Sequence, residues 1–199
     1  MKNLISELIC TRISHDIIGN IGAVANASEL LEEGDMDFLD DIKSILKTSS
    51  FNLTSRMKFF RMAFGVDNNN LDSRELVMQT TENYLTSLGN SDYPITLDFA
   101  VNNSKNHKTA MVVTMIMADL LIRGGSISIT DNSNIIAQIS TTHRISNDKW
   151  QKLQGLLQGN IDCVDANTAH LALLVERYGL EKIKLTSDGE YYRLTLVQD

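Results

Sequence analysis

The 199-residue sequence lacks several features that mark common protein classes. It contains one proline and two cysteines, and aromatic residues make up only 6% of the chain. Cys10 and Cys163 have no Cys-x-x-Cys or metal-type spacing, so we expect both to be reduced core residues. No uninterrupted apolar stretch is long enough for a signal sequence or a membrane span. We therefore expect a cytoplasmic protein without a membrane partner.

Positive charge is also scarce in this chain. The formal net charge is −7, and the isoelectric point is about 5.1. Proteins that bind nucleic acid need clustered lysine and arginine to neutralise phosphates, so nucleic acid is not an expected partner. The 43% apolar and 22% charged residues are ordinary for a chain that buries a core. The length allows one domain or two modest ones.

The N-terminal third of the sequence has the pattern of two long helices. The first 65 residues contain no proline, and apolar residues recur at steps of three and four. This predicts one helix over residues 4–33 and a second that ends at Gly65. Gly34 suits the C-terminal cap of the first helix, and Asp35 or Asp37 suits the N-terminal cap of the second.

Two helices of this length leave apolar surface that a lone hairpin cannot bury. At 1.5 Å per residue each helix would be roughly 45 Å long, with apolar residues over more than one narrow stripe. A second copy of the hairpin would cover this surface in a four-helix bundle with two-fold symmetry. We therefore expect a homodimer, with residues 1–66 as its helical hairpin.

Beyond a polar break at residues 66–70, helical and strand patterns alternate. Helices are expected over residues 71–88, 106–122, 147–158 and 167–178, and strands over residues 93–99, 126–130, 134–139, 181–186 and 191–197. This order predicts a helix-covered, mostly antiparallel sheet over residues 71–199, a two-layer α/β sandwich. The whole chain is then of the α+β class.

Of the four histidines, His15 has the most informative surroundings. His15, Gly19, Gly22 and Asn26 step by four, three and four residues, so they share one helix face. Each glycine inside a helix costs about 1 kcal/mol relative to alanine. The glycines indicate either close approach of a partner at this face or helix packing within the bundle. The other histidines are expected to be structural: His107, His143 and His170.

The chemistry of His15 suits phosphoryl transfer. A free imidazole has a pKa of about 6.5, so it is a nucleophile at neutral pH. A carboxylate beside it can accept a hydrogen bond from the second ring nitrogen and fix the tautomer. Asp16 is the first choice for this carboxylate. Glu7 or a residue from the partner helix is the alternative.

The segment around His15 resembles the phosphoacceptor box of two-component signalling proteins. The similarity covers CTRISHDII from Cys10, followed by a Gly-Ala pair and Glu-Leu-Leu, within residues 10–31. RMKFFRMAFG at residues 56–65 and Arg-Gly-Gly at residues 123–125 fit the same family. The chain is most similar to the ChpT-type histidine phosphotransferases of alphaproteobacterial phosphorelays.

This resemblance implies a dimeric helical hairpin followed by a degenerate histidine-kinase-like ATP-binding domain at residues 71–199. It implies that His15 takes a phosphoryl group from one receiver-domain aspartate and passes it to another. Asp16 matches the acidic residue after the phosphoacceptor. The receiver-docking residues would be Arg12, Gly19, Gly22 and Asn26. The implied partners are response-regulator receiver domains and a hybrid histidine kinase, and Mg²⁺ is needed only in the receiver, so no cofactor of this chain is expected.

Two positions depart from the resembled pattern. Asn20 stands where the family usually has proline, so we expect a less kinked first helix. Gly19 stands where related bifunctional kinases place Thr or Asn to position a water molecule. A phosphatase activity by that route is therefore not expected.

The motifs of an ATP site are missing. Such a site in this fold needs an asparagine-bearing helix, an Asp-x-Gly-x-Gly loop and a glycine-rich lid. The segment 111–119 has no asparagine and one acid, Asp119, and the segment 167–172 has no glycine. Asp188-Gly189 lacks the glycine that should follow. We therefore expect a phosphotransferase that is not an ATP-dependent kinase. The alternative function is a non-catalytic receiver-binding adaptor.

Overall fold

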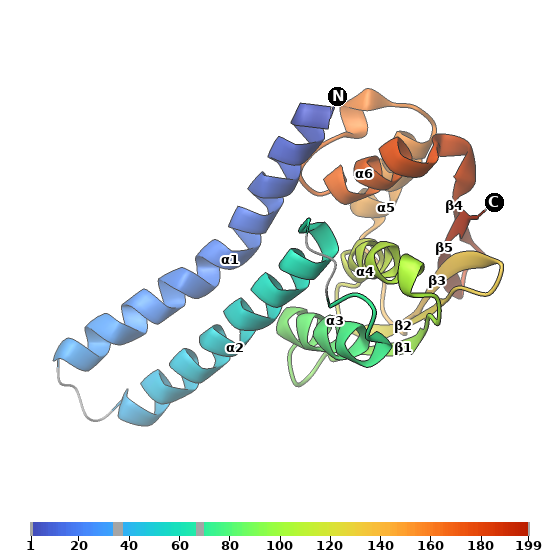
Figure 1. Cartoon of the computed structure of the whole chain (residues 1–199). Coiled ribbons are helices and arrows are strands. Elements are labelled where there is room, and N and C mark those ends of the chain that lie inside the picture. Colours follow the sequence, from blue (N-terminus) through green and yellow to red (C-terminus); the bar gives the residue numbers. More distant parts are fainter. Residues whose placement is uncertain (1, 34–37, 67–69, 199) are drawn as a thin grey trace.

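The computed structural model describes residues 2–33, 38–66 and 70–198 (Figure 1). The helices are α1 (Lys2–Glu33), α2 (Leu39–Phe64), α3 (Arg74–Leu88), α4 (Ser104–Ala118), α5 (Asn147–Leu157) and α6 (Ala169–Tyr178), with short 3-10 helices at Ile161–Cys163 and Leu180–Lys182. The strands are β1 (Ile95–Ala100), β2 (Gly125–Thr130), β3 (Asn134–Ser140), β4 (Ile183–Ser187) and β5 (Tyr191–Val197). The predicted α+β class is confirmed.

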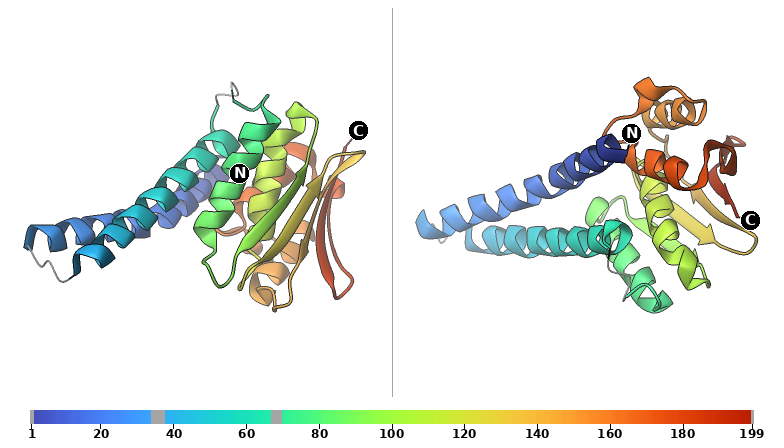
Figure 2. Two further views of the ribbon diagram at one scale, coloured as in Figure 1. Left: turned by 90° about the horizontal axis from the view of Figure 1, so that it is seen from below. Right: turned by 45° about the horizontal axis from the view of Figure 1, so that its top comes forward.

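Helices α1 and α2 form an antiparallel hairpin that extends away from the sheet (Figures 1 and 2). Ala27, Ile42 and Ser49 are buried along it, so they mark the contact between the two helices. Helix α1 runs without interruption through Asn20. The predicted caps Gly34, Asp35 and Asp37 lie outside the described residues.

The hairpin carries apolar side chains that the chain itself does not cover. Those that are more than 40% exposed are Leu4, Ile18, Ile21, Leu30 and Leu31 on α1 and Ile45, Phe51 and Met57 on α2. The predicted dimeric four-helix bundle would bury part of this surface, and it stays a prediction. No described helix has both the length and the apolar content needed to cross a membrane.

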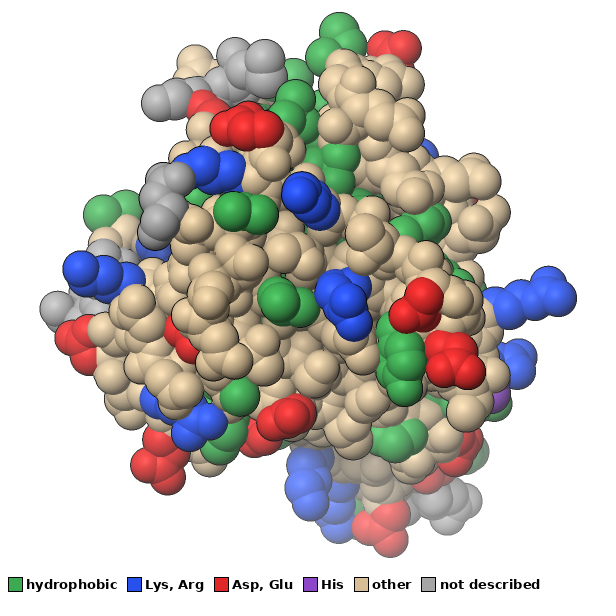
Figure 3. All heavy atoms as spheres, turned by 90° about the vertical axis from the view of Figure 1, so that its right-hand side faces the viewer, with side chains coloured by type: hydrophobic (Ala, Val, Ile, Leu, Met, Phe, Trp, Pro, Cys, Tyr) green, Lys and Arg blue, Asp and Glu red, His purple; other side chains and the backbone are tan. Residues whose placement is uncertain are grey.

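The sheet has the strand order β1-β2-β3-β5-β4. Strands β1 and β2 are parallel and are joined by α4, whereas the other three pairs are antiparallel. The helices cover one face, and the alternation along β2 places Ile127 and Ile129 towards them with Ser126 and Ser128 on the other face. Figure 3 faces the side on which the sheet lies, where charged side chains of both signs are scattered among uncharged ones. The prediction of a mostly antiparallel, helix-covered sheet is confirmed.

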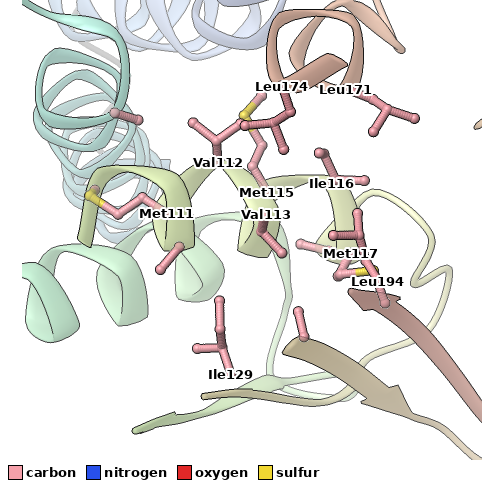
Figure 4. Close-up of a cluster of buried hydrophobic side chains, with 14 of the residues drawn as sticks. Met111, Val112, Val113, Met115, Ile116, Met117, Ile129, Leu171, Leu174 and Leu194 are labelled. Carbon is pink, nitrogen blue, oxygen red and sulfur yellow. The ribbon is translucent and has the colours of Figure 1, made fainter. Parts of the chain in front are cut away.

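Helix α4 is the centre of the core. It lies between the sheet and the other helices, and every residue from 106 to 118 except half-buried Lys108 is buried (Figure 4). Met111, Met115 and Met117 fill this core. The helix begins at Ser104, two residues before the predicted start, because Asn103 caps it by accepting a hydrogen bond from the backbone N–H of Lys105.

The N-terminal half of α1 packs against α6 and joins the same core. Ile5 is 2% exposed, and Ile9, Ile13 and Ile17 pack against the core cluster at steps of four residues. The opposite side of this half of α1 carries His15. The packing of the isoleucines therefore fixes the direction in which the His15 side faces.

Candidate functional site

His15 lies on the open side of α1, and its side chain is 87% exposed. The other histidines differ in position. His107 and His170 are buried, and His143 is on an exposed loop. The structure thus places His15 on the hairpin surface, with its ring accessible to a partner.

Asp16 lies beside His15 but is bound elsewhere in this conformation. Its Oδ1 is 3.9 Å from Nδ1 of His15, longer than a hydrogen bond. Its Oδ2 accepts a hydrogen bond of 2.9 Å from Nε of Arg12, one turn earlier on α1. The expected direct hydrogen bond to His15 is therefore absent here, and Asp16 contributes a nearby negative charge. Its catalytic role stays a prediction.

Arg12 connects α1 to the C-terminal half of the chain. Besides Asp16, its guanidinium donates hydrogen bonds of 2.7 Å to Oδ1 of Asp119 and 2.7 Å to Oδ1 of Asn167. Burial disfavours its charge, but Asp119 and Asp16 outweigh burial and raise the pKa of Arg12. Only 12% of the side chain is exposed. Its predicted role in receiver docking is not tested by these contacts.

Asp119 is the acceptor at the centre of this network, directly after α4. Its Oδ1 also lies 4.0 Å from Nζ of Lys149, and its Oδ2 lies 3.3 Å from Nε2 of buried His170. Burial by itself would raise the pKa of Asp119, but contact with His170, followed by Arg12 and Lys149, lowers it below the usual value. The carboxylate is therefore kept charged inside the protein.

A second arginine holds the other side of this region. Arg56 of α2 donates a hydrogen bond of 2.6 Å to the backbone oxygen of Asp16, and further bonds to the backbone oxygen and hydroxyl of Ser87 at the end of α3. Helices α1, α2 and α3 therefore meet at Asp16, the residue after His15. Arg56 opens the 56–65 block that supported the resemblance, but sequence analysis assigned it no role.

A buried tyrosine lies beneath the same network. The ring of Tyr84 stacks on Phe59, with centroids 3.9 Å apart. Among the described residues its hydroxyl has no hydrogen-bond partner. Burial, together with the negative charges of Asp119 and Asp16, raises the pKa of Tyr84 well above its usual value. The phenol is therefore neutral at physiological pH.

The glycine face predicted around His15 is open in this chain. At Gly19 and Gly22, an added Cβ would meet nothing within 4 Å beyond the backbone of α1, and Asn26 is exposed. The glycines thus do not serve the packing of α1 on α2. Among the described residues, no cluster of three His, Cys, Asp or Glu side chains could hold a metal ion.

Asp119, Asn167 and Arg56 are the contacts that sequence reasoning missed. Asp119 did carry a signal, because it is the one acid in the apolar run from residue 111 to 121. An isolated carboxylate in such a run needs a buried partner. Nothing in the sequence identifies that partner as Arg12.

Comparisons with known proteins found similarity in sequence over part of the chain and in fold over most of it. No family model matches the chain. Over 61 residues, or 31% of the chain, it is 46% identical to Protein phosphotransferase ChpT of Brucella abortus (strain 2308). That alignment spans 28% of the relative's length. A solved structure of a bacterial phosphotransferase matches with a TM-score of 0.75 and 24% identity, covering 96% of this chain and 94% of that one. The chain shares that fold. It is also ChpT-like in sequence over about a third of its length.

Proposed function

We propose that this protein is a histidine phosphotransferase in which His15 carries a phosphoryl group between receiver-domain aspartates. The observation that carries the proposal is an 87% exposed imidazole beside the carboxylate of Asp16, which Arg12 binds, while Arg56 binds the backbone oxygen of the same residue. The similarity to ChpT and to a bacterial phosphotransferase fold supports the same activity.

The transfer would be a reversible displacement at phosphorus. A ring nitrogen of His15 attacks the aspartyl phosphate of the donor receiver, the bond from phosphorus to the carboxyl oxygen breaks, and the receiver regains its carboxylate. The phosphorylated imidazole carries positive charge that Asp16 stabilises at close range. A second receiver reverses the step. Mg²⁺ in the receiver balances the phosphate charge, and this chain supplies no cofactor.

We place the docking surface on the face that surrounds His15. Gly19, Gly22 and Asn26 lie within three turns of it and leave room for a receiver backbone. Gly19 also offers no side chain to orient a hydrolytic water. A relay therefore fits this face better than a phosphatase.

We propose that a second copy covers part of the apolar surface of the hairpin. Ile21, Leu31 and Phe51 are each more than 40% exposed in the single chain, which is costly for a surface helix pair. Light scattering measures the mass of the protein in solution, and we expect twice the mass of the single chain. A monomer at micromolar concentration would contradict the dimer.

We propose that the C-terminal half does not bind ATP. The carboxylate of Asp119, directly after α4, is bound by Arg12, and the side chain of Asn167 before α6 is bound by the same guanidinium. These contacts leave neither side chain free to hold a metal ion or a phosphate. Calorimetric titration with Mg-ATP should show no heat of binding.

The relay is tested with two receivers. A receiver phosphorylated with labelled phosphate is mixed with this protein, and an unphosphorylated second receiver is then added. We expect label on this protein first and on the second receiver later, with neither step in His15→Gln. Receiver binding without any transferred label would instead identify a non-catalytic adaptor.

A further inference from the structure

A chain of alternating charges runs from the C-terminal half of the protein to His15. Asp119 contacts Arg12 at 2.7 Å, and Arg12 contacts Asp16 at 2.9 Å. Oδ1 of Asp16, the oxygen that Arg12 does not bind, is 3.9 Å from the His15 ring. A phosphoacceptor histidine on an isolated hairpin would not need Asp119, the buried end of this series of charges.

We infer that Arg12 and Asp119 are positioning residues for His15, which hold the Asp16 carboxylate beside the imidazole while the ring takes up a phosphoryl group. This rests on the proposed function and deepens it. It assigns Arg12 to the interior of the chain, in place of the receiver-docking surface.

The hydrogen bonds that the Arg12 side chain already makes support this assignment. Three of its nitrogens donate to acceptors of the same chain, on α1, after α4 and before α6. With 12% of the side chain exposed, little of it is left for a partner. His15, by contrast, is exposed enough to rotate, and a shift of about 1 Å would bring its ring within hydrogen-bond distance of Asp16.

Asp119 fixes the position of Arg12. Its Oδ1 accepts a hydrogen bond of 2.7 Å from the guanidinium, while Lys149 and His170 lie 4.0 Å and 3.3 Å from the same carboxylate. Arg12 is thereby held where its Nε reaches Oδ2 of Asp16, which leaves Oδ1 of Asp16 for the imidazole ring. Asp119 is therefore placed to affect a ring that it does not touch.

Phosphoramidate separates positioning from docking, because it is a small phosphodonor with no surface to dock. The ring nitrogen attacks phosphorus, the P–N bond breaks, and ammonia leaves with a proton. We expect Arg12→Gln and Asp119→Asn each to slow phosphorylation of His15 by about 10-fold, with the double variant no slower than the slower single one. Exposed Arg144 provides the matched control, and Arg144→Gln should react at the wild-type rate.

Circular dichroism is used to check whether each variant is folded. Arg12→Lys keeps the charge without the forked geometry, so it should react at an intermediate rate, and it replaces Arg12→Gln if that variant does not fold. Arg12→Gln could instead accept phosphate slowly from a receiver but react with phosphoramidate at the wild-type rate. That result would make Arg12 a docking residue and overturn the proposal. Multiplying effects in the double variant would overturn it as well.

The same measurements keep this proposal separate from the proposed function. Wild-type protein that reacts with phosphoramidate at His15 but never with a phosphorylated receiver would refute the relay. The dependence of the phosphoramidate rate on Arg12 and Asp119 would still decide the positioning role.

Discussion

The carboxylate of Asp119 lies 2.7 Å from the guanidinium of Arg12, although 107 residues separate the two in the sequence. This ion pair joins the hairpin to the helices that cover the sheet. It is shielded from solvent on both sides, since each side chain is 12% exposed or less. The hairpin is thus tied to the C-terminal half by charge as well as by apolar packing.

Removing one partner of this pair should be costly. Asp119→Ala removes one of the three acceptors of the Arg12 guanidinium, which is only 12% exposed, so we expect the free energy of unfolding to fall by about 2 kcal/mol. Urea unfolding followed by circular dichroism measures it. Asp98→Ala, at an exposed acid on β1, is the control and should change stability by less than about 0.5 kcal/mol. Equal losses for the two variants would refute the buried ion pair.

The same carboxylate should make stability depend on acid pH. Because the pKa of Asp119 is lower in the folded protein than the unfolded value of about 3.9, its contribution is complete above about pH 4. It is lost as the pH falls through the folded pKa. The stability difference between wild type and Asp119→Asn should therefore shrink as the pH falls below about 4. A difference that widens on acidification would show the opposite shift.

Asp131 should hold the start of α4 in place. Its carboxylate accepts hydrogen bonds from the backbone N–H groups of Asn102 and Asn103 and from the side chain of Asn106. Burial alone would raise the pKa of Asp131, but these bonds lower it. We expect Asp131→Ala to lower the free energy of unfolding by about 2 kcal/mol in a denaturant titration. Asn132→Ala, at the exposed neighbour, should have little effect, and a similar loss there would contradict this role.

The glycines of the hairpin give a test of what lies against α1. Nothing beyond its own helix approaches a Cβ at Gly19, so Gly19→Ala should stabilise the helix by up to about 1 kcal/mol. At Gly65 a Cβ would clash with the backbone oxygen of Arg61, so Gly65→Ala should destabilise the protein. Thermal unfolding compares the two. A loss of stability in Gly19→Ala would indicate that a second copy packs closely at this face.

The sequence was most informative where local periodicity decides structure. The helices over residues 4–33 and 147–158 and the strands over residues 126–130 and 191–197 were found to within a few residues. Boundaries moved where a side chain caps a helix, as Asn103 does for α4. The parallel pairing of β1 and β2 is a long-range relation that no local pattern contains.

The site was only partly predictable for the same reason. His15 and its open glycine face follow from helical spacing, and the structure places them where that spacing indicates. The ion pair of Arg12 with Asp119 depends on tertiary packing. A charged residue one turn before His15 has the pattern of a surface docking group, and only the fold shows it turned inward.

The most direct test of the central claim is the site of phosphorylation after incubation with a phosphorylated receiver. His15 and His143 are both exposed, so His143→Gln is the matched control for His15→Gln. We expect acid-labile, alkali-stable label on wild type and His143→Gln, located at residue 15 by mass spectrometry, and none on His15→Gln. Label that persists in His15→Gln would contradict the account.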